Sequence, residues 1–310
     1  MKRFVITVTM MLATLSVSTS AFPWGSATHA HIDGQLGKIT LFDAQERYGG
    51  MGADVFNFMF TNPAIATYLY GQSHTEFMKV WDAARKPAEK ALAFGFVSHN
   101  DVWGADMTAH HNGLTFGQGQ GYVIAKAEIL KGMLNQVPEF AALELPDPVV
   151  MEIAHNFVEY GTDILLKRSD PLIGHKMIIS ALVRRPDFPA LLIKAYGEGL
   201  AATAGISRLE AAQLITTTEM EFRKTIISYG QALTLDEATA VQLLSEQMAA
   251  LAVGFLNAYG IVLPDGLDLV PLLNLGISQA MVLCASDFQG ELAATVDEVR
   301  QQLKEHKIRY

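Results

Sequence analysis

The stretch from Phe94 to His111 constrains the fold most, because it sets metal-ligand side chains within a largely apolar segment. On a helix that turns about 100° per residue, His99, Asp106 and His110 fall within roughly 40° of one another. Imidazole and carboxylate groups are both common zinc ligands. Asp106 and His110 are four residues apart, so they lie on adjacent turns. The spacing therefore predicts one helix that presents one side of a metal site.

A second pair of ligand types lies in the predicted helix Val149–Leu166, which follows an Asp-Pro pair. His155 and Glu159 are one turn apart and share a face, which Asp163 continues. Taken alone, this pair is equally compatible with a solvated stripe. Seven of the nine histidines precede residue 160, so candidate ligands are concentrated in the first half of the chain.

Two further candidates precede these helices. His29 falls in the first turn of a helix that Ser26 or Thr28 would cap. Asp54 follows Gly49–Gly52, where the density of glycine predicts a loop rather than a regular element. Asp54 is therefore either a turn-forming residue or a ligand.

His74 is the remaining candidate in this part of the chain. Ser73 and Glu76 have the spacing of a capping box, which predicts that a helix begins here with His74 in its first turn. The glycine-rich segment Gly113–Gly121 lacks the Lys and Ser/Thr of a phosphate-binding P-loop, and no strand precedes it. We expect it to be a flexible connection or the rim of a site.

The amino terminus and the charge bound the class of protein. Residues 1–21 have the basic start, apolar run and small-residue end of a secretory signal peptide, so we expect an exported protein, periplasmic or secreted. Loss of Lys2 and Arg3 would take the formal net charge from −9 to −11, which argues against a stable nucleic-acid complex. The single cysteine, Cys284, lies in an apolar run and is expected to be buried.

The remaining pattern is helical throughout. No long alternating strand pattern, fixed-period repeat or linker composition stands out, so we predict one all-α fold: a signal peptide (1–21), a helical domain (22–168) and a helical extension packed on the same core (169–310). The apolar runs Met248–Leu263 and Leu269–Ala285 fall short of the roughly 20 uninterrupted apolar residues of a membrane span.

Five short motifs in a fixed order resemble the zinc-dependent phospholipase C family. That family includes the amino-terminal domain of glycosylphosphatidylinositol-specific phospholipase D and is more distantly similar to the fungal single-strand-specific zinc nucleases. The resemblance covers roughly residues 24 to 165, and no motif is specific alone. The motifs are Trp24-Gly25 with Thr28-His29, Gly52-Ala53-Asp54-Val55-Phe56, Ser73-His74 with Phe77, Phe94 to His99 leading to Asp106 and His110, and His155 with Glu159.

This resemblance implies an α-helical fold that binds two or three zinc ions. By resemblance, the first zinc is held by Asp54, His74, His99 and Asp106, the second by His110, His155 and Glu159, and the third by His29, Asp106 and the backbone of an amino-terminal Trp. Asp54 and Glu159 are the candidate catalytic residues, with Asp54 orienting or deprotonating the attacking water.

The chain departs from the family pattern in its spacing. The family separates the helix His from the bridging Asp by four residues, whereas His99 and Asp106 are seven apart and Trp103 occupies the fourth position. Two alternatives to Asp106 on a regular helix are a local bulge and Asp101 as a replacement ligand. Asp101, however, lies about 200° from His99 on a regular helix. The assignment between His110 and His111 is also open.

A second departure concerns the amino terminus. Cleavage after Ala21 would leave Phe22 first instead of Trp24, so the free amine of the third zinc site would be missing.

These observations predict an exported zinc-dependent phosphodiesterase that hydrolyses phospholipid head groups through a zinc-activated water. Its substrate would be a phospholipid or another phosphodiester, and peripheral contact with a membrane is compatible with that activity. A single-strand nuclease is one alternative, with Trp103, Phe116 and Tyr122 available for base stacking. The other is a zinc-binding envelope protein without turnover.

Overall fold

The computed structural model describes residues 24–37, 41–59, 62–184, 186–258, 260–263 and 266–309. These residues form fifteen α-helices and one short 3-10 helix and contain no β-strand, so the predicted all-α class is confirmed. The predicted signal peptide, residues 1–21, lies outside the described residues.

The first half of the chain forms the elements that carry the candidate ligands. They are α1 (Ser26–Leu36), α2 (Asp43–Gly52), the 3-10 helix η1 (Ala53–Phe58), α3 (Pro63–His74), α4 (Met78–Ala83), α5 (Pro87–His99), α6 (Ala105–His110), α7 (Tyr122–Leu134), α8 (Pro138–Ala141) and α9 (Asp147–Ser169). The second half forms α10 (Ile173–Val183), α11 (Asp187–Ala204), α12 (Arg208–Leu233), α13 (Glu237–Ala258), α14 (Val270–Cys284) and α15 (Phe288–Glu305).

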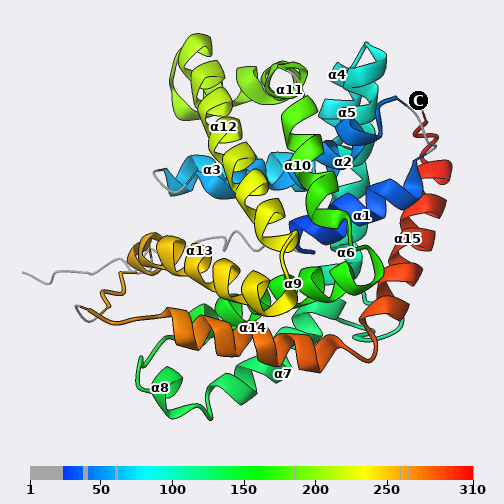
Figure 1. Ribbon diagram of the computed structural model, residues 1–310. Helices are drawn as coiled ribbons and strands as arrows, with labels where there is room; N and C mark the ends of the chain where they lie inside the picture. The colour runs from blue at the N-terminus through cyan, green and yellow to red at the C-terminus, as the bar shows by residue number, and fades with distance from the viewer. Residues whose placement is uncertain are drawn as a thin grey trace, which may run out of the picture.

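The helices form two packed sets (Figure 1). In one set α9 packs against α7 and α14, and α13 packs on α14; in the other α2 packs against α5 and α10, and α12 packs against α10 and α11. The helix α1 contacts both sets through α2 and α9, and α15 runs along one side against α1 and α6. The region around α1 is therefore where ligands from both sets can meet.

One continuous hydrophobic core joins both halves of the chain. Fully buried aromatic side chains from early and late parts of the chain belong to the same cluster, including Trp24, Phe96, Phe157, Phe222 and Phe288. Cys284 is buried in this core, as predicted. Burial of such large apolar surfaces is the main stabilising contribution available to a chain without an internal disulfide.

The predicted single helix from Phe94 to His111 is wrong, because the chain turns sharply after His99. The side chain of Asn100 accepts backbone N–H groups from Val102 at 2.8 Å, Trp103 at 2.9 Å and Gly104 at 3.3 Å. These bonds stabilise a turn in place of a helical continuation. A new helix, α6, begins only at Ala105.

The predicted loop at Gly49–Gly52 is also wrong, because these glycines end α2. They allow α2 to approach α5 closely: a Cβ at Gly49 would lie 2.0 Å from the carbonyl oxygen of Leu92. Likewise, a Cβ at Gly95 on α5 would lie 2.0 Å from the carbonyl oxygen of Glu46. The glycines thus permit close helix packing, and Asp54 lies on η1 directly after α2.

The predicted helix start at Ser73 is wrong as well, since α3 ends at His74. The helix instead begins at Asn62-Pro63, where the Asn62 side chain accepts the N–H of Ile65. The hydroxyl of Ser73 donates to the carbonyl oxygen of Tyr70 instead of capping a new helix. His74 therefore lies at a helix carboxyl end.

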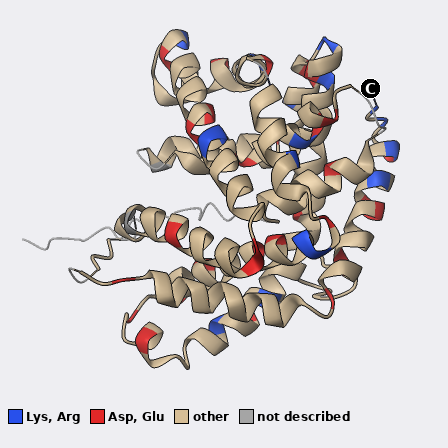
Figure 2. Ribbon diagram, viewed as in Figure 1, with Lys and Arg blue, Asp and Glu red and all other residues tan. Residues whose placement is uncertain are grey.

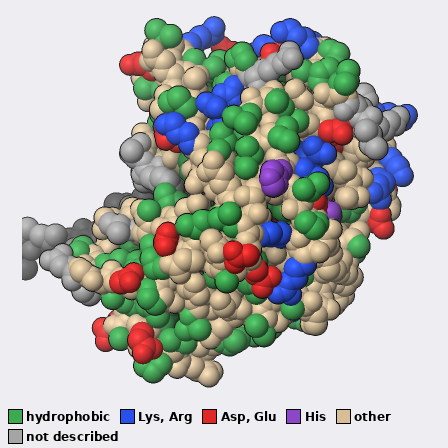
Figure 3. Space-filling model, viewed as in Figure 1, with side chains coloured by type: hydrophobic (Ala, Val, Ile, Leu, Met, Phe, Trp, Pro, Cys, Tyr) green, Lys and Arg blue, Asp and Glu red, His purple; other side chains and the backbone are tan. Residues whose placement is uncertain are grey.

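Charged residues of both signs are interspersed along the helices (Figure 2). Figure 3 shows hydrophobic side chains at the surface of the same face; on α10, the large exposed ones are Ile179, Leu182 and Val183. Among the described residues, no helix is long and apolar enough on its own to cross a membrane. The helices α14 and α15 reach that length and composition only when taken together, and the chain bends by 74° between them.

Candidate metal centre

The eight predicted ligands come from six helical elements and converge inside the molecule. They are His29 on α1, Asp54 on η1, His74 on α3, His99 on α5, Asp106 and His110 on α6, and His155 and Glu159 on α9. All except His110 are at most 2% exposed. Side chains that are far apart in sequence thus form a buried polar cluster.

The first ligand group contains five of these residues and is arranged around Asp106. Asp106 Oδ2 lies 2.8 Å from His99 Nε2 and 3.4 Å from His74 Nε2. Its other oxygen, Oδ1, lies 3.2 Å from His29 Nε2. Asp54 Oδ1 faces the same imidazoles, 3.4 Å from His74 Nε2 and 3.6 Å from His99 Nε2. Asp106 therefore has one oxygen available for each of two cations.

The second ligand group consists of His110, His155 and Glu159. His110 Nε2 and His155 Nε2 are 3.1 Å apart, and His155 Nε2 is 3.2 Å from Glu159 Oε1. Because Asp106 and His110 are both on α6, this helix contributes to both groups.

The ligand atoms are arranged as around a cation. In a tetrahedral site with bonds of about 2.0–2.1 Å, neighbouring ligand atoms are about 3.3 Å apart. The Nε2 atoms of His74 and His99 are 3.3 Å apart. Among the described residues, no well-aligned hydrogen-bond donor faces either oxygen of Asp106, Asp54 Oδ2 or Glu159 Oε1. Buried carboxylate oxygens that face imidazoles without aligned hydrogen bonds fit a bound metal ion.

The electrostatics of the cluster also fit a cation. In the described part of the chain, the ion pairs of Asp54 and Asp106 are all with histidines. Burial would lower the pKa of His99, but the charges of Asp106 and Asp54 raise it well above its usual value. Burial, with the charge of Asp54, raises the pKa of Glu159. Protons on these groups offset the buried negative charge when no metal is bound, and a metal ion would displace them.

Backbone carbonyl groups orient two of the imidazoles. His99 Nδ1 lies 2.8 Å from the carbonyl oxygen of Gly50, and His74 Nδ1 lies 3.0 Å from that of Tyr70. A proton on each Nδ1 leaves Nε2 with a free electron pair. This is the tautomer that a metal ligand needs. The ring of Tyr70 also stacks on His74, with 3.8 Å between the ring centroids.

Asp163 continues the ligand face of α9, as predicted, but it caps α1 instead of joining either group. Its carboxylate accepts the backbone N–H groups of Ala27 and Thr28, both at 2.8 Å, and the Thr28 hydroxyl at 2.7 Å. The hydroxyl of Tyr229 on α12 donates to it at 2.9 Å. Burial raises the pKa of Asp163 to about 6, although these donors oppose the rise. Asp163 thereby fixes the helix that carries His29.

The two alternative ligands lie beside the second group. Asp101 does not replace Asp106; its Oδ1 lies 3.2 Å from His110 Nδ1 and 3.4 Å from His111 Nε2. His110 is the histidine that faces His155, whereas the His111 side chain is 59% exposed. Exposure increases from Glu159 towards His111, so the cluster approaches solvent at this end.

Trp24 lies beside α6 and is fully buried. Its indole N–H donates to the hydroxyl of Thr108 at 3.2 Å, and its ring stacks on Tyr122. Phe22, which would be the first residue after cleavage at Ala21, lies outside the described residues.

Two of the three aromatic residues that were candidates for base stacking are packed inside the protein. Trp103 is buried against Phe77 and stacks on His306, and Tyr122 is buried with its hydroxyl on Asp287. Phe116 is half-buried, and Lys126 Nζ lies 4.0 Å from the centre of its ring. Trp103 and Tyr122 therefore offer no free face to a nucleic-acid base.

The glycine-rich segment Gly113–Gly121 is tied to α15 by a residue that the sequence patterns did not identify. The buried carboxylate of Glu291 accepts the backbone N–H groups of Leu114 and Thr115, both at 2.6 Å, and that of Phe116 at 3.1 Å. Because this segment directly follows α6, Glu291 fixes the chain beside His110 and His111.

Two residues near the ligands were also missed. Glu152 is buried on α9, and its charge contributes to the raised pKa of Glu159. Glu152 lies three residues before His155 and seven before Glu159. These are helical spacings, so the sequence could have identified it. Tyr70 lies one turn before His74, at a spacing that could likewise have been noticed.

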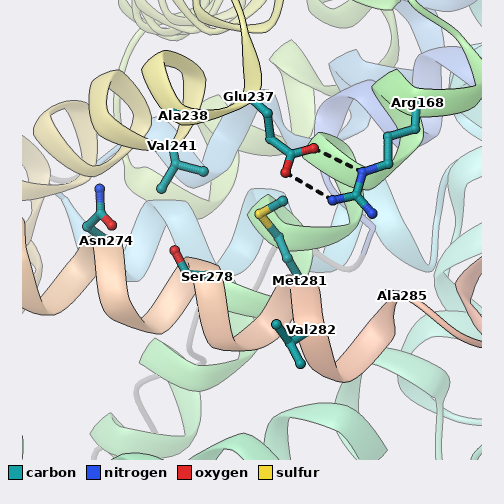
Figure 4. A pocket seen from close by; sticks show the side chains of 9 residues that line it. All are labelled: Arg168, Glu237, Ala238, Val241, Asn274, Ser278, Met281, Val282 and Ala285. Carbon is teal, nitrogen blue, oxygen red and sulfur yellow. Dashed lines mark hydrogen bonds and ion pairs between the residues drawn. The ribbon is translucent and has the colours of Figure 1, made fainter.

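A separate hollow of about 530 Å³ lies between the end of α9, α13 and α14 (Figure 4). At its edge the Arg168 guanidinium donates two hydrogen bonds of 2.9 Å to Glu237. None of the eight candidate ligands lines it. Its apolar side chains, with Asn274 and Ser278, offer no cluster of metal ligands.

Comparison with known proteins found no matching family model, curated protein or solved structure.

Proposed function

We propose that the chain is an exported zinc-dependent phosphodiesterase with phospholipase C-like activity on phospholipid head groups. The observation that carries the proposal is the position of Asp106, whose two oxygens face His29 on one side and His74 and His99 on the other. The second ligand group follows one helical turn later on α6. The resemblance to the zinc-dependent phospholipase C family and the signal-like residues 1–21 add support from sequence.

The chemistry of the donor atoms favours zinc. Imidazole nitrogen and carboxylate oxygen without thiolate are typical of catalytic zinc sites, and no Lys or Arg is paired with the first ligand group in the described part of the chain. When bound, zinc ions would lower the pKa of water and offset the negative charge of a phosphodiester.

Asp54 is the side chain best suited to handle a proton. Burial alone would raise its pKa, but the charges and hydrogen bonds of His99 and His74 lower it. The carboxylate is therefore ionised at neutral pH, and its Oδ2 has no hydrogen-bond partner among the described residues. Asp54 would orient a water molecule or accept its proton, while His155 and Glu159 complete the second ligand group.

A zinc-binding envelope protein without turnover is the second candidate. The deep burial of seven of the eight ligands favours it, because a substrate must reach the metal. The partly exposed end at Asp101, His110 and His111 favours an enzyme. The nuclease alternative is weaker, since Trp103 and Tyr122 are packed inside the protein.

Initial rates of hydrolysis on phosphatidylcholine vesicles and on single-stranded DNA test this proposal. We expect the wild-type chain to hydrolyse the lipid, His155→Ala and Glu159→Gln to lose that activity while staying helical, and Glu246→Gln on the exposed face of α13 to keep it. Retained turnover in the first two variants would contradict the assignment. Faster DNA cleavage would favour the nuclease, and bound zinc without turnover would favour the binding protein.

A further inference from the structure

The turn between α5 and α6 holds Asp101 in a defined position. Besides the three N–H groups that Asn100 accepts, the backbone N–H of Asp101 itself donates to the carbonyl oxygen of His74 at 3.2 Å. The seven-residue spacing between His99 and Asp106 leaves room for this turn. A residue of the first ligand group is thereby tied through its backbone to Asp101.

The Asp101 carboxylate is directed towards the second ligand group. Its Oδ1 lies 3.2 Å from His110 Nδ1, and its Oδ2 accepts the hydroxyl of Tyr70 at 3.4 Å. Its side chain is only 16% exposed. A carboxylate therefore faces the outer nitrogen of this imidazole.

This contact selects one tautomer of His110. A carboxylate beside Nδ1 places the imidazole proton there, which leaves the electron pair of Nε2 directed towards the ligand group. His110 Nε2 accordingly faces His155 Nε2 at 3.1 Å. His74 has the Ser73 hydroxyl and a backbone carbonyl group at Nδ1, and His99 has a backbone carbonyl group, whereas His110 has a carboxylate in this position.

We propose that Asp101, steadied by the Tyr70 hydroxyl, is a positioning residue that fixes the tautomer and orientation of His110 as a metal ligand. The proposal rests on the proposed zinc-binding function. It also gives Tyr70 two roles, because its ring stacks on His74 while its hydroxyl reaches Asp101. Tyr70 and Asp101 together link a ligand of the first group to a ligand of the second.

A competing explanation is an additional outer metal ion held by Asp101, His110 and His111, whose ligand atoms lie close together. Such an ion would need the Nδ1 electron pair of His110 while Nε2 serves the inner group, so the imidazole would have to lose both protons. One Asp101 oxygen also accepts from Tyr70, and His111 is mostly exposed. These contacts favour the positioning role.

The test is zinc affinity, measured on the full chain by competition with a chromophoric chelator, together with zinc content per chain. We expect Asp101→Ala to weaken the binding of one zinc ion by about 10–100-fold while the other affinity stays unchanged. Asp101→Asn should keep part of the affinity, because its side-chain oxygen can still accept the Nδ1 proton. Tyr70→Phe, which keeps the ring on His74, should weaken the same zinc ion less.

His111→Gln is the matched control, because it removes the other histidine beside Asp101. We expect its zinc content and affinities to equal those of the wild type. Loss of one zinc ion in this variant would reveal an outer metal site and overturn the positioning role. Unchanged affinities in Asp101→Ala would also overturn it.

A wild-type chain that bound no zinc would overturn the proposed function and this inference with it. Wild-type binding with unaffected variants would overturn the inference alone. Helical circular dichroism identifies any variant that fails to fold, and Tyr70→Phe and Asp101→Asn then decide the test.

Discussion

His99 and Gly50 are joined across the α2 and α5 interface, with His99 Nδ1 2.8 Å from the Gly50 carbonyl oxygen. This contact depends on how closely the two helices approach. A Cβ on Gly95 would lie 2.0 Å from the backbone of α2 at Glu46, so only glycine fits there without moving a helix. The orientation of a candidate metal ligand is thus set by a glycine one helical turn away on α5.

Gly95→Ala should therefore affect both stability and metal binding. We expect the free energy of unfolding to fall by about 1–3 kcal/mol, because the added methyl forces the helices apart. We expect zinc affinity to fall as well, because the Gly50 carbonyl group would no longer orient His99. Denaturant unfolding and chelator competition measure the two effects.

Gly132→Ala on α7 is the control for this substitution, because a Cβ at Gly132 meets nothing within 4 Å. It should stabilise the protein by about 0.5–1 kcal/mol, since alanine is the better helix former. Equal stability of the two variants would contradict the close-packing explanation.

Glu89 should make a pH-dependent contribution to stability. It accepts the backbone N–H groups of Arg85 and Lys86 at the start of α5 and the ammonium group of Lys194 on α11. Burial alone would raise the pKa of Glu89, but these hydrogen bonds lower it from 4.5 to about 2. Because the pKa is depressed in the folded protein, the contribution is complete above about pH 4.5 and is lost as the pH falls towards 2.

Glu89→Gln should therefore lower the free energy of unfolding by about 1–2 kcal/mol at pH 7. The difference from the wild type should shrink as the pH falls below 4.5. Urea unfolding at several pH values measures it, with Glu221→Gln on the exposed face of α12 as a control that should show no such trend. A difference that grew on acidification would contradict the assigned contacts.

Metal removal should destabilise the fold. Without a cation, Asp54, Asp106 and Glu159 are buried together, and their ion pairs within the described ranges are all with histidines. We expect dialysis against a chelator to lower the midpoint of thermal unfolding. Zinc should then raise the midpoint in a concentration-dependent way, because each bound ion adds about 4 kcal/mol to the free energy of unfolding when free zinc exceeds Kd by 1,000-fold. A midpoint that did not respond to chelator or zinc would argue against metal binding to the folded protein.

Sequence patterns identified the side chains that converge, but they were less successful with the helices that carry them. The order and identity of His29, Asp54, His74 and His99 led to residues that do meet, and their role as ligands stays a prediction. The helical stripe placed Asp106 beside His99 correctly for the wrong reason, because the chain turns at Asn100 and begins a new helix. Local spacing cannot distinguish a continuous helix from a turn that returns the chain to the same side.

Contacts between distant residues were beyond sequence patterns. Asp163 caps α1 more than 130 residues earlier in the chain, and Tyr229 reaches it from 66 residues later. Glu291 holds a segment 177 residues away. Each of these side chains sits in an ordinary amphipathic helix, so nothing local separates a buried anchor from a solvated acid.

Elemental analysis of the chain, purified without chelator or added metal, measures how many zinc ions the fold binds. We expect two or three zinc ions per wild-type chain and at least one fewer in Glu159→Gln. One zinc ion or none in the wild type, or equal content in the two proteins, would contradict this expectation.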